Sequence, residues 1–503
     1  MASDYKRMLV TSPILGIIQN TPADTIDPRA FVTAHNVVFR NGQVEKVKGW
    51  KQSERSAVGS VNFIEIGKYD SVSLSSLVGT NQNLYNYLPS ALTQLNPTPF
   101  LCMKGNRWDS DYLFEQWFFS NLQDGLWAWN GQGQAYPYTN AAAYKAQCMA
   151  QFQNHILLGN IMSPNDPTGP WTIAGSSLLT GGQVLWDLEN PNSDSIVFEV
   201  PEEASPIQAL KRSNSQLIVY KEKSIFTLAY VGGGFEYNKQ QVITNVGLKA
   251  RASLVDFGDK HVYLGTDNLY SFNGSNNQSF GDRIWQWLQS DAAINSTAQI
   301  WAFLDRRFKE VIFAYITTGA TTFTKALVWN YQYDAFSTRD FPFTACGYFL
   351  DPVNSGSISS LQQAIDTYGV LGGSKLGILA GDSLGQLWKL DETTDLAGTN
   401  PLVAILETGD TCFGAPERYK VVGGMDIEQV GMTGSPLQVY VAARKSLADP
   451  LVWAGPYSLP ANSGWRGVNF MSQNVWYRFR FVKPDGAMVL RGYAPRFQVR
   501  GWY

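Results

Sequence analysis

The sequence predicts an all-β protein, with a β-propeller of six or seven blades followed by an additional C-terminal antiparallel β domain. A strand-turn-strand pattern recurs along the first four-fifths of the chain, and long alternating strands of a different kind follow it. The composition agrees, because 13% aromatic residues and 45 glycines in 503 residues are rich in strand and turn formers.

The repeated unit is clearest in the segment Val262–Gly274, where an apolar run precedes a polar turn with Gly and Asp and a second alternating run. This pattern is typical of a β-hairpin. Looser copies recur along the chain, and an aromatic residue marks the second strand of each copy. The markers are Tyr85, Trp127, Trp186, Phe226, Tyr270, Trp329 and Trp388. They are roughly 40 to 60 residues apart, which is the period of four-stranded propeller blades.

Residues 1–60 are predicted to form an N-terminal arm and a hairpin. The segment Lys6–Ile18 superficially resembles a signal peptide, but Pro13 interrupts it, so we expect an extended arm or strand that packs on the protein. Two short apolar runs then flank Asn41-Gly42, and this dipeptide is the strongest short-range signal for a hairpin.

The propeller pattern covers residues 61–400, and closure of its blades into a ring would remove exposed sheet edges. Residues 401–503 are predicted to form the C-terminal β domain, which would be available for docking and oligomer contacts. Four long alternating strands are expected in it, over Tyr419–Ile427, Leu437–Ala443, Val475–Val482 and Met488–Val499.

Positive charge is concentrated in the last region. Residues 402–503 hold 11 Lys and Arg against 7 Asp and Glu, a net charge of +4, which leaves −7 for residues 1–401. Strand alternation places Arg478 and Arg480 together on the face opposite three aromatic residues. Arg496 and Arg500 would extend this basic face if the final strand pairs alongside. We interpret the four arginines as candidate contacts with an acidic subunit or with DNA phosphate, and a solvated outer face is the alternative.

The sequence contains no recognisable catalytic, cofactor-binding or metal-binding motif. Propellers that hydrolyse glycans need paired carboxylates and, for acidic sugars, clustered arginines, but the inner strands supply no obvious pair. The four cysteines are far apart and suit small buried side chains in a chain made in a reducing cytoplasm. A net charge of −3 argues against a general nucleic-acid coat. We therefore expect a structural protein, not an enzyme, with no cofactor and no metal.

Three stretches of strand and turn pattern carry a resemblance to a known family. They are Asn36–Trp50, Leu217–Leu288, and Leu327–Arg339. In these stretches and in the order of its parts, the chain resembles the tail nozzle proteins of short-tailed bacteriophages, also called packaged-DNA stabilisation proteins.

The resemblance implies a virion protein that assembles as a ring, expected to be a homo-hexamer, below the portal and the head-to-tail adaptor protein. Such a ring continues the DNA channel, retains the packaged genome, and conducts it during ejection without sequence-specific binding. A tail needle, fibre or tailspike is a further implied partner. The protein would be made in the host cytoplasm and located in the virion tail, and its sequence has no segment of membrane-spanning length.

A second hypothesis is a propeller that binds or hydrolyses glycans, as a tail or secreted protein. Aromatic platforms beside carboxylates would be its mark, and the 16 Trp and 24 Tyr leave it open. Most of these aromatic residues occupy strand positions, where packing in the core is the simpler explanation.

Overall fold

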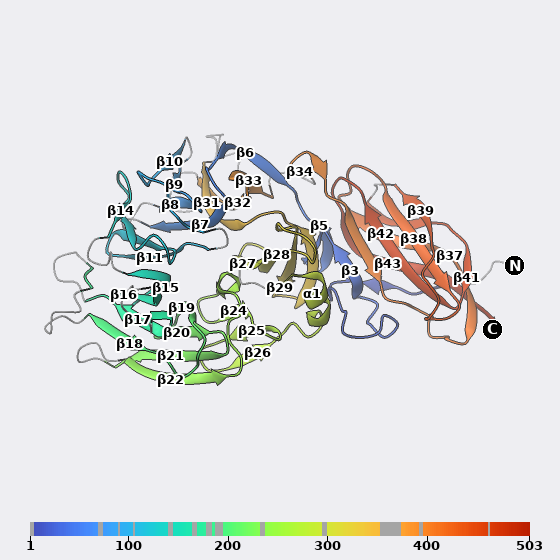
Figure 1. Ribbon diagram of the computed structural model, residues 1–503. Helices are drawn as coiled ribbons and strands as arrows, with labels where there is room; N and C mark the ends of the chain where they lie inside the picture. The colour runs from blue at the N-terminus through green and yellow to red at the C-terminus, as the bar shows by residue number, and fades with distance from the viewer. Residues whose placement is uncertain are drawn as a thin grey trace.

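The computed structural model describes residues 5–68, 74–88, 91–103, 106–138, 144–162, 169–177, 184–186, 195–231, 237–293, 299–352, 374–391, 396–460 and 463–502. Nearly all of its elements are β-strands, and these residues include one short α-helix, α1 (Trp285–Asp291). Figure 1 shows a ring of blades with a second β body beside it. The predicted all-β fold, a propeller with an additional β domain, is therefore confirmed.

Seven antiparallel four-stranded units form the propeller. Blade 1 contains β7 (Val61–Lys68), β8 (Leu74–Thr80), β9 (Leu84–Tyr87) and β10 (Leu92–Gln94). Blade 2 contains β11 (Asp109–Leu113), β12 (Gln116–Ser120), β13 (Trp127–Trp129) and β14 (Tyr136–Pro137). Blade 3 contains β15 (Lys145–Phe152), β16 (His155–Met162), β17 (Thr172–Gly175) and β18 (Ile196–Glu199). Blade 4 contains β19 (Ile207–Ser213), β20 (Gln216–Lys221), β21 (Ser224–Tyr230) and β22 (Tyr237–Thr244). Two short 3₁₀ helices, η2 (Gly169–Trp171) and η3 (Arg251–Ser253), precede β17 and β23.

The remaining blades complete the ring. Blade 5 contains β23 (Val255–Asp256), β24 (His261–Leu264), β25 (Leu269–Phe272) and β26 (Asn277–Ser279). Blade 6 contains β27 (Ile300–Asp305), β28 (Glu310–Tyr315), β29 (Lys325–Asn330) and β30 (Ala335–Asp340). Blade 7 contains β31 (Ala345–Pro352), β32 (Ser374–Gly381), β33 (Gln386–Leu390) and β6 (Trp50–Ser56). The first strand of each blade is the innermost one, and residues of β7, β11, β19, β27 and β31 line one cavity in the central channel of the ring.

The aromatic markers identify the third strand of six of the seven blades. Trp186 is the exception, because the third strand of blade 3 is β17, and the Trp186 indole packs beside it with Nε1 3.5 Å from the Ala174 oxygen. Tyr270 and Trp329 are buried, whereas Trp127 and Trp388 are half-buried. A polar turn residue of the same hairpin accepts a hydrogen bond from each of these four side chains, in the pairs Trp127–Asp124, Tyr270–Asp267, Trp329–Asp334 and Trp388–Asp382.

The propeller begins earlier than the predicted boundary at residue 61. Strand β6, which was assigned to the N-terminal region, pairs with β33 as the outer strand of blade 7. A strand that precedes blade 1 in sequence thus joins the last blade and closes the ring. The sequence analysis missed β6 because this segment is polar after Trp50 and lacks the apolar alternation of the other strands. Two short strands, β34 (Leu396–Ala397) and β35 (Asn400–Pro401), extend its edge.

The second body is a β-sandwich built from both ends of the chain. One sheet contains β4 (Val37–Arg40), β5 (Gln43–Lys46), β43 (Val489–Trp502), β37 (Arg418–Val430) and β40 (Gly464–Val468), with the short strands β1 (Lys6–Arg7), β2 (Val10–Thr11) and β41 (Ser472–Asn474) at its sides. The other contains β3 (Phe31–His35), β36 (Ala404–Thr408), β42 (Trp476–Lys483), β38 (Leu437–Arg444) and β39 (Trp453–Leu459). The four long strands expected after residue 401 are confirmed as β37, β38, β42 and β43.

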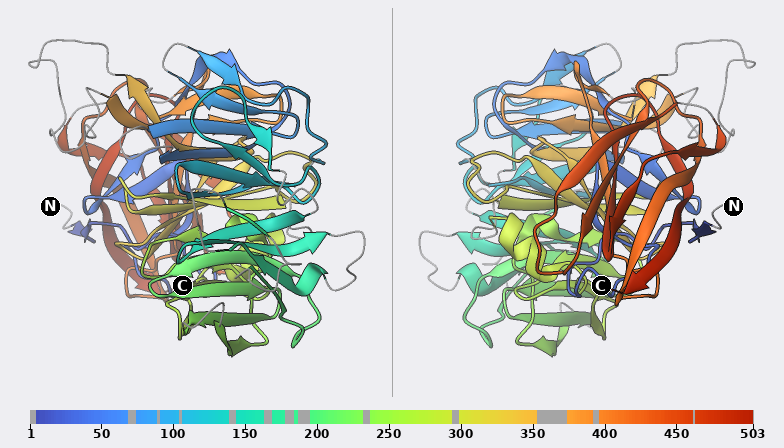
Figure 2. Two further views of the ribbon diagram at one scale, coloured as in Figure 1. Left: turned by 90° about the vertical axis from the view of Figure 1, so that its left-hand side faces the viewer. Right: turned by 90° about the vertical axis from the view of Figure 1, so that its right-hand side faces the viewer.

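The sandwich and the propeller are not separate units, contrary to the predicted division into residues 1–60, 61–400 and 401–503. Strand β3 pairs with β30 of blade 6 on one side and with β36 on the other, so one nine-stranded sheet passes from the propeller into the sandwich. In Figure 2 the blue N-terminal segments lie beside the red C-terminal strands. Hydrophobic alternation predicts strands but not their partners, which is why the sequence analysis separated the two ends.

The N-terminal arm packs on the protein, as expected. Strands β1 and β2 pair with β43, and the side chains of Val10 and Ile17 are buried. Gly16 has a φ of 74°, and an added Cβ would come within 2.5 Å of the Phe336 nitrogen. The Asn41-Gly42 turn is also confirmed, with φ values of 50° and 73°.

Buried charges reinforce the junction between the two bodies. Arg40 of β4 donates two hydrogen bonds, of 2.7 and 2.8 Å, to the carboxylate of Glu310 on β28, and both side chains are almost inaccessible to water. Close by, Arg307 lies 3.0 Å from both Asp305 and Asp391. Such two-point arginine–carboxylate contacts define both distance and orientation, so they hold the hairpin on blade 6 in one position.

Candidate functional site

The predicted basic face of β42 is an ion-pair cluster. The alternation is confirmed, because Tyr477, Phe479 and Phe481 are buried and the two arginines lie on the opposite face. Arg478 contacts two carboxylates, with hydrogen bonds of 3.1 and 2.6 Å to Asp410 and 3.1 Å to Glu407. Its side chain keeps only 13% of its surface exposed. Arg478 is therefore an internal ion-pair partner, not a free contact residue.

Two more arginines complete this cluster. Arg480 donates hydrogen bonds of 3.1 and 2.9 Å to the same oxygen of Glu407, and its guanidinium lies 4.0 Å from the ring centre of Trp453. Arg444 contacts Asp410 at 2.6 Å. Three arginines thus face two carboxylates. Burial alone would lower the pKa of Arg478, but its contacts with Asp410 and Glu407 outweigh this and raise it. Most of the charge of the predicted face is neutralised within the chain.

The expectation that Arg496 and Arg500 extend this face is wrong. They lie on β43, which pairs with β37 and β5 in the opposite sheet, whereas β42 lies between β36 and β38. Arg496 contacts Asp426 at 3.6 Å and donates to the Val468 oxygen at 3.2 Å. Arg500 is exposed. The four predicted arginines are therefore divided between two sheets.

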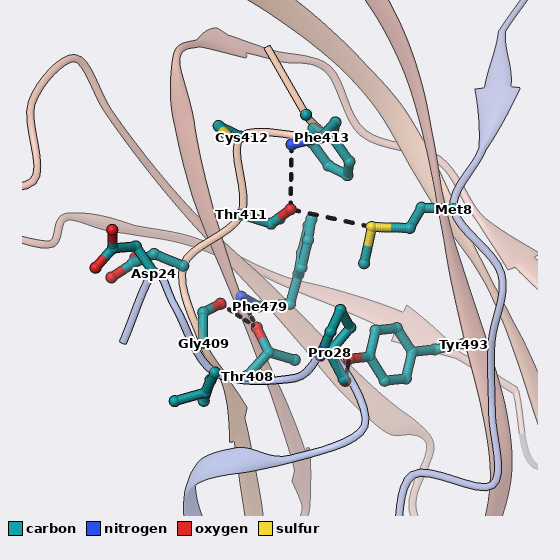
Figure 3. A pocket seen from close by; sticks show the side chains of 13 residues that line it. Met8, Asp24, Pro28, Thr408, Gly409, Thr411, Cys412, Phe413, Phe479 and Tyr493 are labelled. Carbon is teal, nitrogen blue, oxygen red and sulfur yellow. Dashed lines mark hydrogen bonds between the residues drawn. The ribbon is translucent and has the colours of Figure 1, made fainter. Parts of the chain in front are cut away.

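A pocket of about 260 Å³ lies where the N-terminal arm crosses the sandwich (Figure 3). Met8 and the segment Asp24–Pro28 form one side, and the loop Thr408–Gly414 forms the other. The hydroxyl of Tyr493 donates a 2.5 Å hydrogen bond to the Pro28 oxygen, and the Thr411 hydroxyl approaches the Met8 sulfur at 4.0 Å. These contacts attach the arm to the sandwich, so the pocket is best explained as a packing gap under the arm.

The propeller channel contains charged residues that the sequence analysis did not bring together. Glu65, Asp109 and Asp111 lie on the neighbouring innermost strands β7 and β11. Asp109 accepts a backbone hydrogen bond from Met149 at 2.9 Å, and Asp111 accepts one from Gln151 at 2.6 Å. These two carboxylates join blade 2 to blade 3, which gives them a structural role.

Basic residues share this channel. Lys211 of β19 lies 3.8 Å from Asp109, and Arg107 and Arg251 line the same cavity of about 220 Å³. Both arginines come shortly before the first strand of a blade, and Lys211 lies within such a strand. The sequence signal for this site was a charged residue in an innermost strand or just before one. The order of the blades along the sequence does not show that Arg107 of blade 2 and Arg251 of blade 5 meet in the channel.

Comparisons with known proteins add little. No protein-family model matches the chain, and no curated protein matches it in sequence. Similar solved structures include the WD40 domain of Pan2 from Neurospora crassa (10% identity, TM-score 0.36), the computationally designed protein Ika8 (10%, 0.35), and Raptor from Chaetomium thermophilum (9%, 0.38). The alignment with Pan2 covers 67% of this chain and 90% of the Pan2 chain, and the alignment with Ika8 covers 68% and 99% in the same order. The alignment with Raptor covers 69% of this chain and 30% of the Raptor chain. These similarities are too low to carry an argument about function.

Among the described residues, no helix combines the length and the hydropathy that crossing a membrane requires.

Proposed function

We propose that this chain is a subunit of the ring-shaped tail nozzle of a short-tailed bacteriophage, a structural virion protein that continues the DNA channel, retains the packaged genome, and conducts it during ejection. One observation carries the proposal. Two of the three stretches that resemble nozzle proteins, Asn36–Trp50 and Leu327–Arg339, meet at the junction of the propeller and the sandwich. The second stretch contains most of β30, which pairs with β3, and the first contacts blade 6 through the Asn36–Thr338 backbone hydrogen bond and the Arg40–Glu310 ion pair. The resemblance therefore concerns the architecture of the molecule and not an isolated hairpin.

This junction suits a part that bears load. The nine-stranded sheet runs through the junction, where His35 of β3 pairs with Thr338 of β30. A hinge motion there would break the backbone hydrogen bond from Asn36 to the Thr338 oxygen and the hydrogen bonds between the Asn36 side chain and Asp340. The Arg40–Glu310 pair would also have to separate inside the protein, which leaves a buried charge without a partner. A ring that restrains pressurised DNA needs subunits of this rigid kind.

The sandwich offers surfaces for contacts between subunits or with the adaptor. Three of its large apolar side chains are exposed, Val452 by 72%, Trp465 by 41%, and Met471 by 77%. Apolar side chains mark an interaction surface when they form a contiguous patch. Of the four arginines predicted to make contacts, Arg500 is exposed, and the side chain of Arg480 is 33% exposed, compared with 26% for Arg496 and 13% for Arg478. We therefore assign the docking role to Arg500 and Arg480, with Arg478 and Arg496 supporting the sandwich from within.

Reconstitution of particles tests the proposal. Heads that carry the adaptor, made from the encoding phage without this chain, are expected to lose DNA, and the purified full-length chain is expected to restore retention. Mass measurement of the attached protein should show a closed ring of about six copies. A chain that stays monomeric in the presence of these heads and does not restore DNA retention would rule out the nozzle role.

Charge reversal at Arg500 separates docking from folding. Arg500→Glu is expected to weaken attachment to heads and to leave the melting temperature of the free chain unchanged, because exposed charges contribute little to stability. Arg212, an exposed residue of blade 4, provides the matched control, since Arg212→Glu makes the same charge change on the propeller. Equal attachment of the two variants would remove Arg500 from the docking surface.

A glycan-binding or glycan-hydrolysing propeller is the second candidate. The observation in its favour is the set of three channel carboxylates. Asp109 and Asp111 accept backbone hydrogen bonds from blade 3, whereas Glu65 does not take part in these contacts. Glu65 instead accepts a 2.5 Å hydrogen bond from the Ser110 hydroxyl. A glycan array followed by a hydrolysis assay tests this alternative, and loss of hydrolysis in Glu65→Gln would support it.

A further inference from the structure

Two arginines meet in the propeller channel without a carboxylate partner. Nη2 of Arg251, at the start of η3, donates a 2.6 Å hydrogen bond to the backbone oxygen of Arg107. Arg107 itself donates to the backbone oxygens of Asn62 at 3.1 Å and Thr344 at 2.7 Å. Within the described part of the chain, no Asp or Glu oxygen forms an ion pair with either guanidinium at 4.0 Å or less. This differs from the β42 cluster, in which each arginine contacts a carboxylate.

Two features make the arginine pair energetically unfavourable, the repulsion between like charges and a buried hydrogen-bond donor without an acceptor. Burial, and then the charge of Arg251, lower the pKa of Arg107 to about 9, which leaves the Arg107 guanidinium charged at neutral pH. Nη1 of Arg251 is buried and has no hydrogen-bond partner. A buried donor without an acceptor costs free energy, as does the repulsion between two like charges. A bound anion would relieve both costs.

The adjoining cavity has the charge and the size for such an anion. Its volume of about 220 Å³ is bordered by four charged residues, Arg107, Lys211, Arg251 and Asp109, so three cations face one carboxylate. Asp109 lies near Lys211, which leaves the arginine pair uncompensated. The ring of Trp301, 5.6 Å from the Arg107 guanidinium, forms an apolar wall. The space exceeds the roughly 30 Å³ of one liquid water several-fold.

A second cavity, of about 490 Å³, adjoins the first at Arg107, which lines both. Its walls carry amide and hydroxyl side chains with a few apolar ones. The polar residues include Asn62, Gln82, Asn106, Gln299 and Thr344. Uncharged groups of this kind hydrogen-bond hydroxyl-bearing ligands. The two cavities together provide a cationic end and a neutral polar end.

We propose that the channel binds a small oxyanion, the phosphate or carboxylate group of a low-molecular-weight ligand, between Arg107 and Arg251. Guanidinium groups hold such oxyanions through charge-assisted hydrogen bonds. The oxyanion lies in the cavity of about 220 Å³, and the uncharged part of the ligand extends toward the cavity of about 490 Å³. Nη1 of Arg251 is covered by neighbouring atoms, so it reaches the oxyanion after a turn of the guanidinium. This site is independent of the nozzle role.

Anion-dependent melting of the full-length chain tests the site. Inorganic phosphate is expected to raise the melting temperature more than sodium chloride of equal ionic strength, because a ligand that binds the folded state stabilises it. Titration calorimetry with phosphate should then show an affinity that falls by about tenfold or more in Arg251→Gln, which removes a charge-assisted hydrogen bond. Arg466→Gln, on the exposed strand β40 of the sandwich and outside the channel, serves as the control and should bind as the unmodified chain does.

Parallel titrations distinguish the sources of the oxyanion. Stronger binding of phosphate indicates a phosphorylated ligand, and stronger binding of glucuronate indicates an acidic sugar. Arg107→Gln tests the second arginine, but Arg107 also holds Asn62 and Thr344, so Arg251→Gln decides the outcome if the Arg107 variant does not fold. Phosphate and glucuronate that stabilise the chain no more than chloride, or that bind Arg251→Gln with unchanged affinity, would overturn the proposal.

Discussion

The propeller and the sandwich are both antiparallel, but they are assembled from different kinds of contact. In the propeller, successive strands pair as hairpins, and β6 is the strand that joins a blade from far away in sequence. In the sandwich, Val10 pairs with Tyr493 and Phe31 pairs with Thr408. The comparison teaches that the repeat makes a ring from local contacts, whereas the sandwich forms only when both ends of the chain meet.

The largest expected effect comes from removing the N-terminal arm. Deletion of residues 1–20 should destabilise the sandwich by on the order of 5 kcal/mol or more, because it exposes the core around Val10 and Ile17 and opens the edge of β43. Thermal unfolding followed by circular dichroism measures this loss. Leu9, which is 62% exposed, gives a matched control: Leu9→Ser should be nearly neutral and Val10→Ser clearly destabilising. Similar melting of these two variants would contradict the packed arm.

Truncation of a blade marker tests the propeller in the same way. Trp329 is buried, stacks on Phe280 with ring centres 4.1 Å apart, and bonds Asp334. Trp329→Ala should lower the free energy of unfolding by about 3–5 kcal/mol through lost packing and the cavity left behind. Trp465 of the sandwich is 41% exposed, so Trp465→Ala should cost much less in the same denaturant titration. An equal cost would mean that the marker does not pack between blades.

The junction joins the two bodies, and its buried ion pair can be broken from one side. Arg40→Met leaves the Glu310 carboxylate buried and unpaired, so it should cost about 3–5 kcal/mol. Adding Glu310→Leu to this variant should recover most of the loss, because the unpaired charge is removed. Denaturant unfolding of the two single variants and the double variant forms a double-mutant cycle. A double variant as unstable as the sum of the single ones would show that the pair is not coupled.

The smallest expected effect is the loss of stability at low pH that comes from protonation of Asp340. Burial alone would raise the pKa of Asp340, but hydrogen bonds from His35 and Asn36 outweigh it and hold the pKa below its ordinary value of 3.8. A depressed pKa contributes stability that is present above pH 3.8 and is lost as the pH falls through the lower folded-state value. Because Asp340 is half-exposed, the contribution is modest. Melting scans from pH 6 to pH 2.5 should show a slightly shallower decline for Asp340→Asn, and identical curves would contradict the prediction.

Features that depend on local pattern were predictable. The aromatic markers located six third strands, the Asn41-Gly42 dipeptide located a turn, and alternation located the long strands of the sandwich. Strand β6 was not predictable, because its polar residues cover an outer edge and carry no apolar alternation. The burial of Arg478 was also missed, since Glu407 and Asp410 lie about 70 residues earlier in the sequence.

The sequence by itself determined that this chain makes repeated hairpins, a long-stranded C-terminal region and an arm that packs, because side-chain alternation and turn chemistry act between near neighbours. Only the tertiary structure decided which strand closes the ring, which arginines are neutralised, and that Arg107 and Arg251 meet in the channel. Sheet pairing and ring closure bring together residues that are hundreds of positions apart, and a strand's own pattern does not specify its partner.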